Sequence, residues 1–312
     1  MSNISIKVTR GKIVESEHSA RFCVVDSSGK ILWQQGDIGA PIYPRSAMKP
    51  IQALLLIESG ASAAFSLDSQ HLALACASHQ GEDFQIKIIK EWLEILGLNE
   101  KDLECGQHEP FNLPTHHNCS GKHLGFLTVA RHWGIPTQGY IKPDHLVQRA
   151  VTQNICRFTN LNENELVTAT DGCGIPVHAI PLYNLALAMA RFADSQETAP
   201  LQIKSAISRH PFLLGGTQHF ASNLMSKLSP NILLKNGAEG VYVGILPPKK
   251  LGIALKINDG ASRAASVLMG HILIELGLIN EHERSHFKHW LNPPILNNAG
   301  LQVGEIIIDN YT

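Results

Sequence analysis

Residues 21–37, RFCVVDSSGKILWQQGD, have the pattern of a β-hairpin. An apolar run is followed by the turn residues Ser-Ser-Gly-Lys, and a second apolar run then begins at Ile31. Two such runs separated by small polar residues and glycine predict strand, turn and strand. Upstream, Ile4, Ile6 and Val8 alternate with polar residues, so they share one face of another strand. The beginning of the chain is therefore predicted to be a sheet.

Helical patterns fill the middle of the chain. Asp68 is placed to cap a helix, and FQIKIIKEWLEILG (84–97) has apolar residues at helical spacing before a terminal glycine. Strand patterns return late, in GVYVGILPP (240–248), LGIALKIND (251–259) and EIIID (305–309). We therefore expect an α/β fold, with one antiparallel sheet built from both chain ends and a helical subdomain packed beside it.

We expect residues 1–312 to form a single catalytic unit, with the ligand cleft between sheet and helices. The sheet region is predicted at approximately 1–60 and 226–312, and the helical region at approximately 61–225.

The composition is that of an ordinary globular protein. The 312 residues are 44% hydrophobic and 17% charged, with a formal net charge of −1, which argues against a nucleic-acid surface. No run approaches about 18 apolar residues, so no membrane span is expected. The six cysteines are spread along the chain, unlike a disulfide framework. Together with an N-terminus that lacks a signal-peptide pattern, this predicts a cytoplasmic protein with reduced thiols.

RSAMKP (45–50) carries the first candidate catalytic pair. Ser46 and Lys49 are spaced i, i+3, so both side chains share one face of a helix start. A serine is a weak nucleophile until a base takes its proton, and a lysine is a base only when neutral. Lowering its pKa to about 7 requires roughly 4–5 kcal/mol of desolvation or like-charge repulsion. Lys256, inside an apolar strand pattern, is a candidate source of repulsion. The alternative for Ser46 and Lys49 is an exposed helix start.

Ser78, in ACASHQGED (75–83), is a candidate second hydroxyl that relays a proton between two lysines. The alternative is structural, because serine often caps or ends a helix.

Five blocks in this order resemble the bacterial L-asparaginase II family, the Rhizobium-type serine-dependent enzymes. The blocks are YPRSAMKPIQALLL (43–56), ASHQGE (77–82), HNCSGKH (117–123), TDGCGIPVHAIPL (170–182), and GAEGVY (237–242) with LGIALKINDGASRA (251–264). The resemblance runs from about residue 4 to about residue 270. It implies a fold like serine β-lactamases and glutaminases, a homodimer, and hydrolysis of L-asparagine through an acyl-enzyme. By similarity Ser46 is the nucleophile, Lys49 its partner, and Ser78 with Lys256 a second Ser–Lys pair.

The resemblance also implies a zinc site, with Cys119, Lys122 and Cys173 as ligands. Thiolates are good zinc ligands, whereas a lysine must first lose a proton. From the residues alone, THHNCSGKH (115–123) leaves alternatives open. It makes a poor phosphate loop, because His123 follows the lysine where Ser or Thr is needed. A zinc site built from His116, His117 and His123 and a buried cysteine beside surface histidines both remain.

Two charged residues are candidates for holding the amino-acid end of the substrate. Arg45 next to the nucleophile can grip a carboxylate with two hydrogen bonds, and Asp171 can pair with the ammonium. Each has a plain alternative, as a solvent-facing arginine and an Asp-Gly turn respectively. Two other functions also remain: a zinc-dependent amidohydrolase, although H-E-x-x-H is absent, and a non-catalytic amino-acid-binding protein.

Overall fold

Strands from both ends of the chain meet in one antiparallel sheet. The computed structural model describes residues 3–107 and 112–308. The large sheet has the order β10-β11-β1-β2-β9-β8-β7, and β3 also pairs with β2. Its strands are β1 (Ile4–Arg10), β2 (Ile13–Asp26), β3 (Ile31–Gln35), β7 (Leu233–Asn236), β8 (Val241–Leu246), β9 (Leu251–Ile257), β10 (Pro294–Leu296) and β11 (Gln302–Ile308). The predicted sheet from both chain ends is therefore confirmed.

The long strand β2 joins the two halves of this sheet. It pairs with β1 on one side and β9 on the other, with Cys23 opposite Ala254. The sequence around the hairpin makes this strand the centre of the core, because its run Phe22 to Val25 is fully buried. Asp309, the last residue of the predicted C-terminal strand, lies outside the described residues.

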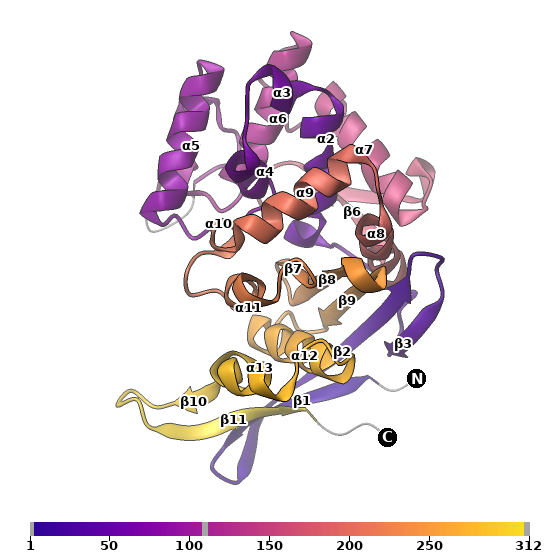
Figure 1. Cartoon of the computed structure of the whole chain (residues 1–312), viewed down its shortest axis with the longest axis vertical. Helices are drawn as coiled ribbons and strands as arrows, with labels where there is room; N and C mark the ends of the chain where they lie inside the picture. The colour runs from indigo at the N-terminus through magenta and orange to yellow at the C-terminus, as the bar shows by residue number, and fades with distance from the viewer. Residues whose placement is uncertain (1–2, 108–111, 309–312) are drawn as a thin grey trace.

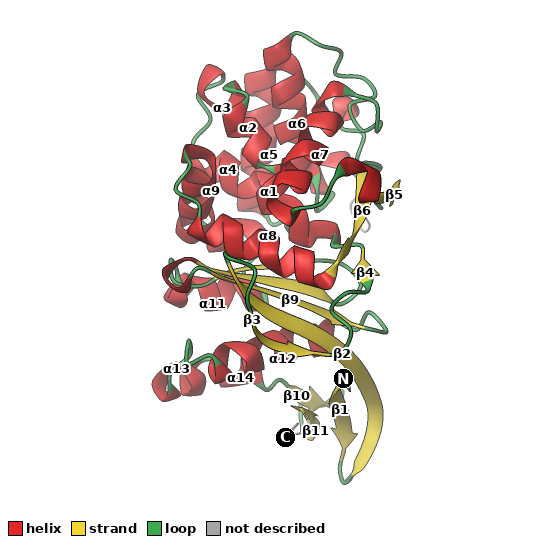
Figure 2. Ribbon diagram, turned by 90° about the vertical axis from the view of Figure 1, so that its right-hand side faces the viewer, coloured by secondary structure: helices red, strands yellow, loops and turns green. Residues whose placement is uncertain are grey.

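Helices cover both faces of the sheet. The helix α8 contacts β2 and β9, and α12 contacts β8 and β9; Figure 2 shows the two helices on opposite faces. Helices α11, α13 and α14 lie on the same side of the sheet as α12, and the other helices stack beyond α8 (Figure 1 and Figure 2). The helices are α1 (Lys49–Gln52), α2 (Leu54–Glu58), α3 (Ala61–Ala64), α4 (Ser69–Ala75), α5 (Asp83–Leu96), α6 (Ser120–Trp133), α7 (Leu146–Thr159), α8 (Leu182–Asp194), α9 (Thr198–Arg209), α10 (Pro211–Gly215), α11 (Phe220–Leu228), α12 (Ser262–Glu275), α13 (Glu281–His286) and α14 (Lys288–Leu291).

The helical region also contains a small second sheet that was not predicted from the sequence. Its order is β4-β6-β5, with strands β4 (Pro41–Ile42), β5 (Val167–Thr170) and β6 (Pro176–Pro181). The burial of β6 alternates strictly, as in a half-buried strand. This strand follows TDGCG directly, so the small sheet holds the loop that carries Asp171 and Cys173.

Close packing of α4 on α6 brings two loops of the sequence motifs together. Gly121, in the first turn of α6, has no space for a side chain, because an added Cβ would lie 2.2 Å from the Leu74 carbonyl oxygen. The glycine of HNCSGKH is therefore required for α6 to begin directly against the end of α4. Among the described helices, none is long and apolar enough to cross a membrane.

Candidate active site

Ser46 lies on a strained turn at the start of the first helices. Arg45 has φ 52°, a left-handed conformation that costs a non-glycine residue energy and that is often found at functional sites. A short 3-10 helix, Arg45–Met48, follows and leads directly into α1, which begins at Lys49. Ser46 is half-buried and Lys49 is fully buried. The predicted helix start is thus present, and its lysine points inward.

The end of strand β7 packs against this turn. An added Cβ on Gly237 would lie 2.5 Å from the Pro44 carbonyl oxygen and 3.4 Å from the Ala47 nitrogen. Only glycine allows this approach, and it places Lys235 and Asn236, the last residues of β7, beside the Ser46 turn.

Two buried lysines contact the hydroxyl of Ser78. Lys49 Nζ lies 3.1 Å from Ser78 Oγ and also donates to the carbonyl oxygens of Ala77 and, at 3.3 Å, Asn118. Lys235 Nζ lies 2.8 Å from the same Oγ, 2.8 Å from Asn236 O and 3.0 Å from Asn236 Oδ1. The structure therefore brings Lys49 and Ser78 together, as expected for a relay, and adds Lys235 as the second lysine.

Lys256, which was expected to pair with Ser78, lies elsewhere. Its Nζ donates to the carbonyl oxygen of Glu239 at 2.7 Å and to that of Ile257. Lys256 stands opposite Arg21 and Val241 at the end of β9, so it supports the turn between β7 and β8 rather than the serines. The expected Ser78–Lys256 pair is corrected to Ser78–Lys235.

Burial of both lysines favours their neutral forms. Burial, followed by the charge of Lys122, lowers the pKa of Lys49, although Cys119 opposes the shift. Burial, followed by the charge of Lys49, lowers the pKa of Lys235 far below its usual range. Two ammonium groups that share one hydroxyl repel each other, so loss of one proton is favoured. Burial and mutual repulsion therefore favour a neutral lysine, which is the form that can act as a base.

The residues expected to bind zinc also lie together. Lys122 Nζ is 3.0 Å from Cys173 Sγ, and the Cys173 thiol donates a hydrogen bond to Cys119. All three side chains are buried. The hydrogen bond from Cys173, together with the nearby Lys122 and Lys49, lowers the pKa of Cys119 well below its usual range despite burial. Two cysteine sulfurs and a lysine nitrogen are therefore gathered at one point.

This donor set fits a zinc ion with an open position, since two sulfurs and one nitrogen leave a fourth site. Burial alone would lower the pKa of Lys122, but Cys119 and Cys173 raise it, so binding metal must release protons. Across residues 3–107 and 112–308, no group of three or more His, Cys, Asp or Glu is arranged to hold a metal. The alternative zinc site of His116, His117 and His123 is therefore wrong; His123 Nδ1 instead lies 2.6 Å from the Tyr140 hydroxyl.

Arg45 and Asp171 form an ion pair with each other. Arg45 Nε lies 2.5 Å from Asp171 Oδ1, and the side chains are 27% and 10% exposed. Burial opposes the charge on Asp171, but Lys122 and Arg45 lower its pKa, so the carboxylate stays ionised. Asp171 Oδ2 also lies 3.6 Å from Cys173 Sγ. A positive and a negative group thus stand side by side, between the Ser46 turn and the cysteines.

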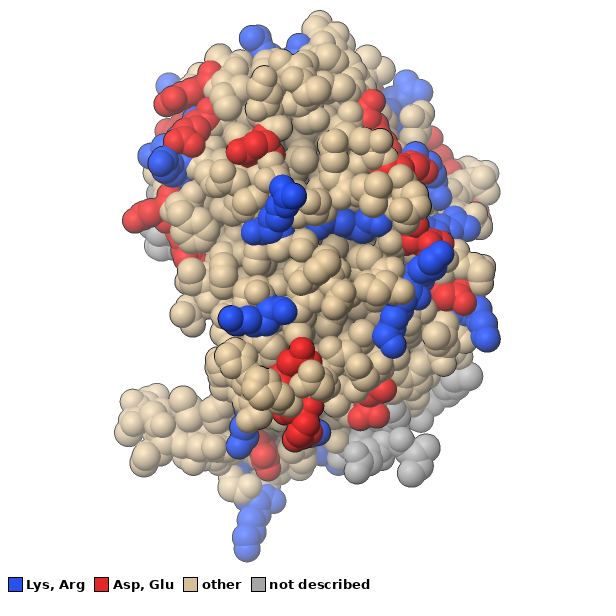
Figure 3. Space-filling view, in the orientation of Figure 1, with Lys and Arg blue, Asp and Glu red and all other residues tan. Residues whose placement is uncertain are grey.

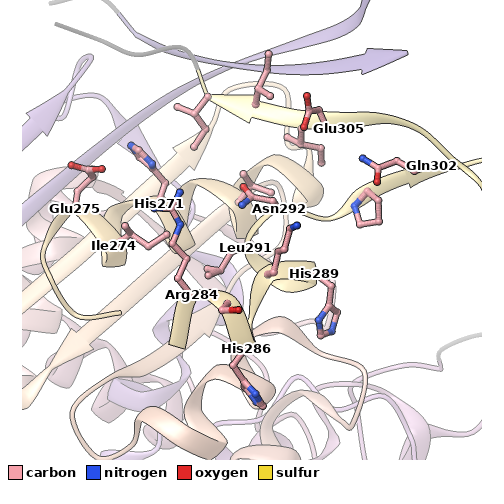
Figure 4. Close-up of a pocket in the computed structure, with 17 residues that line it drawn as sticks. His271, Ile274, Glu275, Arg284, His286, His289, Leu291, Asn292, Gln302 and Glu305 are labelled. Carbon is pink, nitrogen blue, oxygen red and sulfur yellow. The ribbon is translucent and has the colours of Figure 1, made fainter. Parts of the chain in front are cut away.

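One large pocket is remote from these groups. It lies between α12, α13, α14 and the strands β10 and β11, where Figure 4 shows His271, Arg284 and Glu305 around it. Its labelled polar side chains come from the C-terminal elements, and none of the candidate site residues lines it. On the face shown in Figure 3, charges of both signs are interspersed.

Comparison with known proteins identifies the family and the fold. The family described as L-asparaginase II matches residues 6–308. None of the curated proteins compared with the chain matches it. The solved structure of Mglu in its native form has a TM-score of 0.51 and 12% identity, covering 85% of this chain and 66% of that chain. A β-lactamase from Mycobacterium bovis has a TM-score of 0.46 and 14% identity, covering 82% and 94%. A β-lactamase/D-alanine carboxypeptidase from Pseudomonas syringae has 0.39 and 12%, covering 88% and 94%.

The likeness to Mglu is one of fold. The matched family is one of hydrolases that act on amides. Because the family match extends over nearly the whole chain, the protein belongs to the L-asparaginase II family.

Proposed function

We propose that the protein hydrolyses the side-chain amide of L-asparagine, through an acyl-enzyme formed on Ser46. The observation that carries the proposal is the Ser78 hydroxyl shared by two buried lysines, directly beside the strained Ser46 turn. A serine without an adjacent base is a poor nucleophile, and this arrangement supplies the base.

In this proposal Lys49 takes the Ser46 proton. The spacing of the two residues at one helix start and the burial that favours neutral Lys49 support this role. Ser46 Oγ then attacks the amide carbon. The departing nitrogen takes the proton that Lys49 accepted from Ser46 and leaves as ammonia. Ser78 and Lys235 continue the proton path away from Lys49. Water, deprotonated by the same groups, hydrolyses the ester and restores Ser46.

The Arg45–Asp171 pair is proposed to hold the amino-acid end of the substrate. Free asparagine carries a carboxylate and an ammonium on neighbouring atoms, and this pair presents the complementary charges side by side. Binding both charges fixes the distance from the amino-acid end to the amide carbon. Glutamine is one methylene longer, so its amide carbon is displaced from Ser46.

We therefore expect L-asparagine to be preferred over L-glutamine by about a hundredfold in kcat/KM, since misplacement by about 1 Å costs that much. Asp171→Asn should raise KM for asparagine by about tenfold or more, because the ammonium loses its ionised partner. Ammonia release measures both effects. Equal efficiency on the two amides, or an Asp171→Asn enzyme that behaves as the parent, would contradict this binding mode.

We also propose that Cys119, Lys122 and Cys173 hold a zinc ion. When bound, zinc supplies positive charge and Lewis acidity beside the substrate. Asp171 contacts Cys173, so a residue proposed to hold the metal also orients the carboxylate proposed to bind the substrate ammonium.

Each chain should bind one zinc ion. The substitutions Cys119→Ala and Cys173→Ala together should abolish binding, as measured by metal analysis of the purified protein. Removing zinc with a chelator should raise KM more than it lowers kcat, because the proposed nucleophile is a serine. The zinc-dependent alternative predicts the opposite, with no turnover at saturating asparagine in a protein that is still folded. A cytoplasmic location remains a prediction from the sequence, and a homodimer remains an expectation from the family resemblance.

A further inference from the structure

A buried histidine links the two loops that surround Lys49. His79 follows Ser78 in the loop after α4, and Ser120 follows Cys119 at the start of α6. His79 Nε2 lies 2.8 Å from Ser120 Oγ, and the side chains are buried, with relative exposures of 1% and 0%. Neither residue contacts Ser46 or has a part in the proposed proton path.

The surrounding hydrogen bonds fix the tautomer of this histidine. The Gly81 N–H donates to His79 Nδ1 at 3.2 Å, so Nδ1 is an acceptor. Ser120 Oγ donates to the Thr115 carbonyl oxygen at 3.0 Å, so its only proton is already used. His79 Nε2 must therefore carry the ring proton and donate it to Ser120. Burial, followed by the charge of Lys49, lowers the pKa of His79 to about 3, which agrees with a neutral ring.

Lys49 also joins the two segments that the His79–Ser120 hydrogen bond connects. Lys49 Nζ donates to Ala77 O in the first loop and to Asn118 O in the second. The His79–Ser120 bond joins residues two positions further along each segment. Gly121 packs on Leu74 nearby, so the two loops are in contact at the helix ends and tied together at their tips.

We propose that His79 is a positioning residue that holds Ser78 between Lys49 and Lys235. The proposal rests on the proposed function. A ring that donates from Nε2 sets how far the first loop stands from the second, and hence where the neighbouring Ser78 Oγ lies. The opposite side of that loop is held by the Ser78 N–H, which donates to Leu214 O at 2.8 Å. Ser78 then keeps both short contacts to the lysines.

Two substitutions of His79 separate positioning from packing. The side-chain nitrogen of glutamine lies as many bonds from the α-carbon as Nε2, whereas that of asparagine matches Nδ1. His79→Gln therefore keeps the donor to Ser120, and His79→Asn loses it. We expect His79→Asn to lower kcat for asparagine by about 10- to 100-fold with KM within twofold of the parent. His79→Gln should stay within about threefold of the parent kcat.

Ser120→Ala should reproduce the effect of His79→Asn, and the double variant His79→Asn/Ser120→Ala should be no worse than either single variant, because both remove one interaction. Thermal melting of each variant provides the stability control. The proposal is overturned if the asparagine and glutamine variants are equally impaired, which indicates loss of ring packing, or if both match the parent in kcat.

A second measurement needs no turnover. Nitrogen-15 NMR of the imidazole groups, with the His79 signal assigned from its absence in His79→Gln, should show the proton on Nε2 in the parent. Ser120→Ala should shift the Nε2 resonance. Protonation at Nδ1, or no response to Ser120→Ala, contradicts the link. A parent enzyme that releases no ammonia from asparagine would defeat the proposed function, whereas the NMR result would still judge the link between the loops.

Discussion

Ser46→Ala should lower kcat for L-asparagine by at least about 10³-fold, because removing a nucleophile removes the covalent route altogether. The half-buried hydroxyl has little packing to lose, so the melting temperature should change by no more than about 2 °C. Ammonia release at saturating asparagine measures the effect, and mass spectrometry of the parent mixed with substrate tests for the acyl-enzyme.

Ser205→Ala is the matched control, since Ser205 is exposed on α9 and far from the site in sequence. It should retain full activity. Near-parental turnover in Ser46→Ala would refute the assignment of the nucleophile. It would leave the zinc-dependent alternative as the reading to pursue.

Exchanging each of two strand lysines for methionine should lower kcat to very different extents. Lys235→Met should reduce kcat by about 10²-fold or more, because Ser78 loses one of its two amine partners. It should not unfold the protein, since methionine fills the same buried space without the cost of a desolvated charge. Lys256→Met should lower kcat by less than about tenfold, because its Nζ contacts only carbonyl oxygens of the β7–β8 turn and β9 among the described residues. The reverse ranking would restore the pairing first expected from the sequence.

The pH profile of the parent enzyme also tests the pair of buried lysines, Lys49 and Lys235. The neutral form of a lysine is the base, so kcat/KM should rise with pH and level off once the proton is lost. Because burial lowers the pKa of Lys235, that plateau should be reached well below the usual lysine pKa of about 10.4. The charged or titratable groups that act on Lys235 are Lys49, Cys119, Cys76, Lys122 and His219. Lys235→Met should shift the rising limb, and an unmoved limb would assign it to another group.

Local patterns in the sequence were enough to find the Ser46 turn, because Ser46 and Lys49 are neighbours on one helical turn. The second lysine was different. Lys235 and Lys256 both stand in apolar strand runs, ILLKN and LKIND, and neither run says which strand lies beside the helices. Only the strand order, with β7 at the edge against the Ser46 turn, separates them.

The small sheet was missed for a related reason. Strand β5 has only four residues and is exposed along its whole length, so VTAT is too short a pattern to predict a strand. Conversely, the thiols were found through the resemblance, since Cys119 and Cys173 are separated by two helices and a strand that no spacing rule connects. No sequence pattern marked His79, because its proposed role depends on Ser120 at the start of α6.

The order of strands in the large sheet also governs when the protein becomes an enzyme during synthesis. Strand β2 is made early, but its neighbour β9 comes from residues 251–257, and Lys235 reaches Ser78 only through the strands that β9 anchors. Closing such a long stretch of chain is slow compared with forming helices. A ribosome-bound chain can therefore form the Ser46 turn and the helices around it long before any amide is cleaved, and catalytic competence arrives only with the last third of translation.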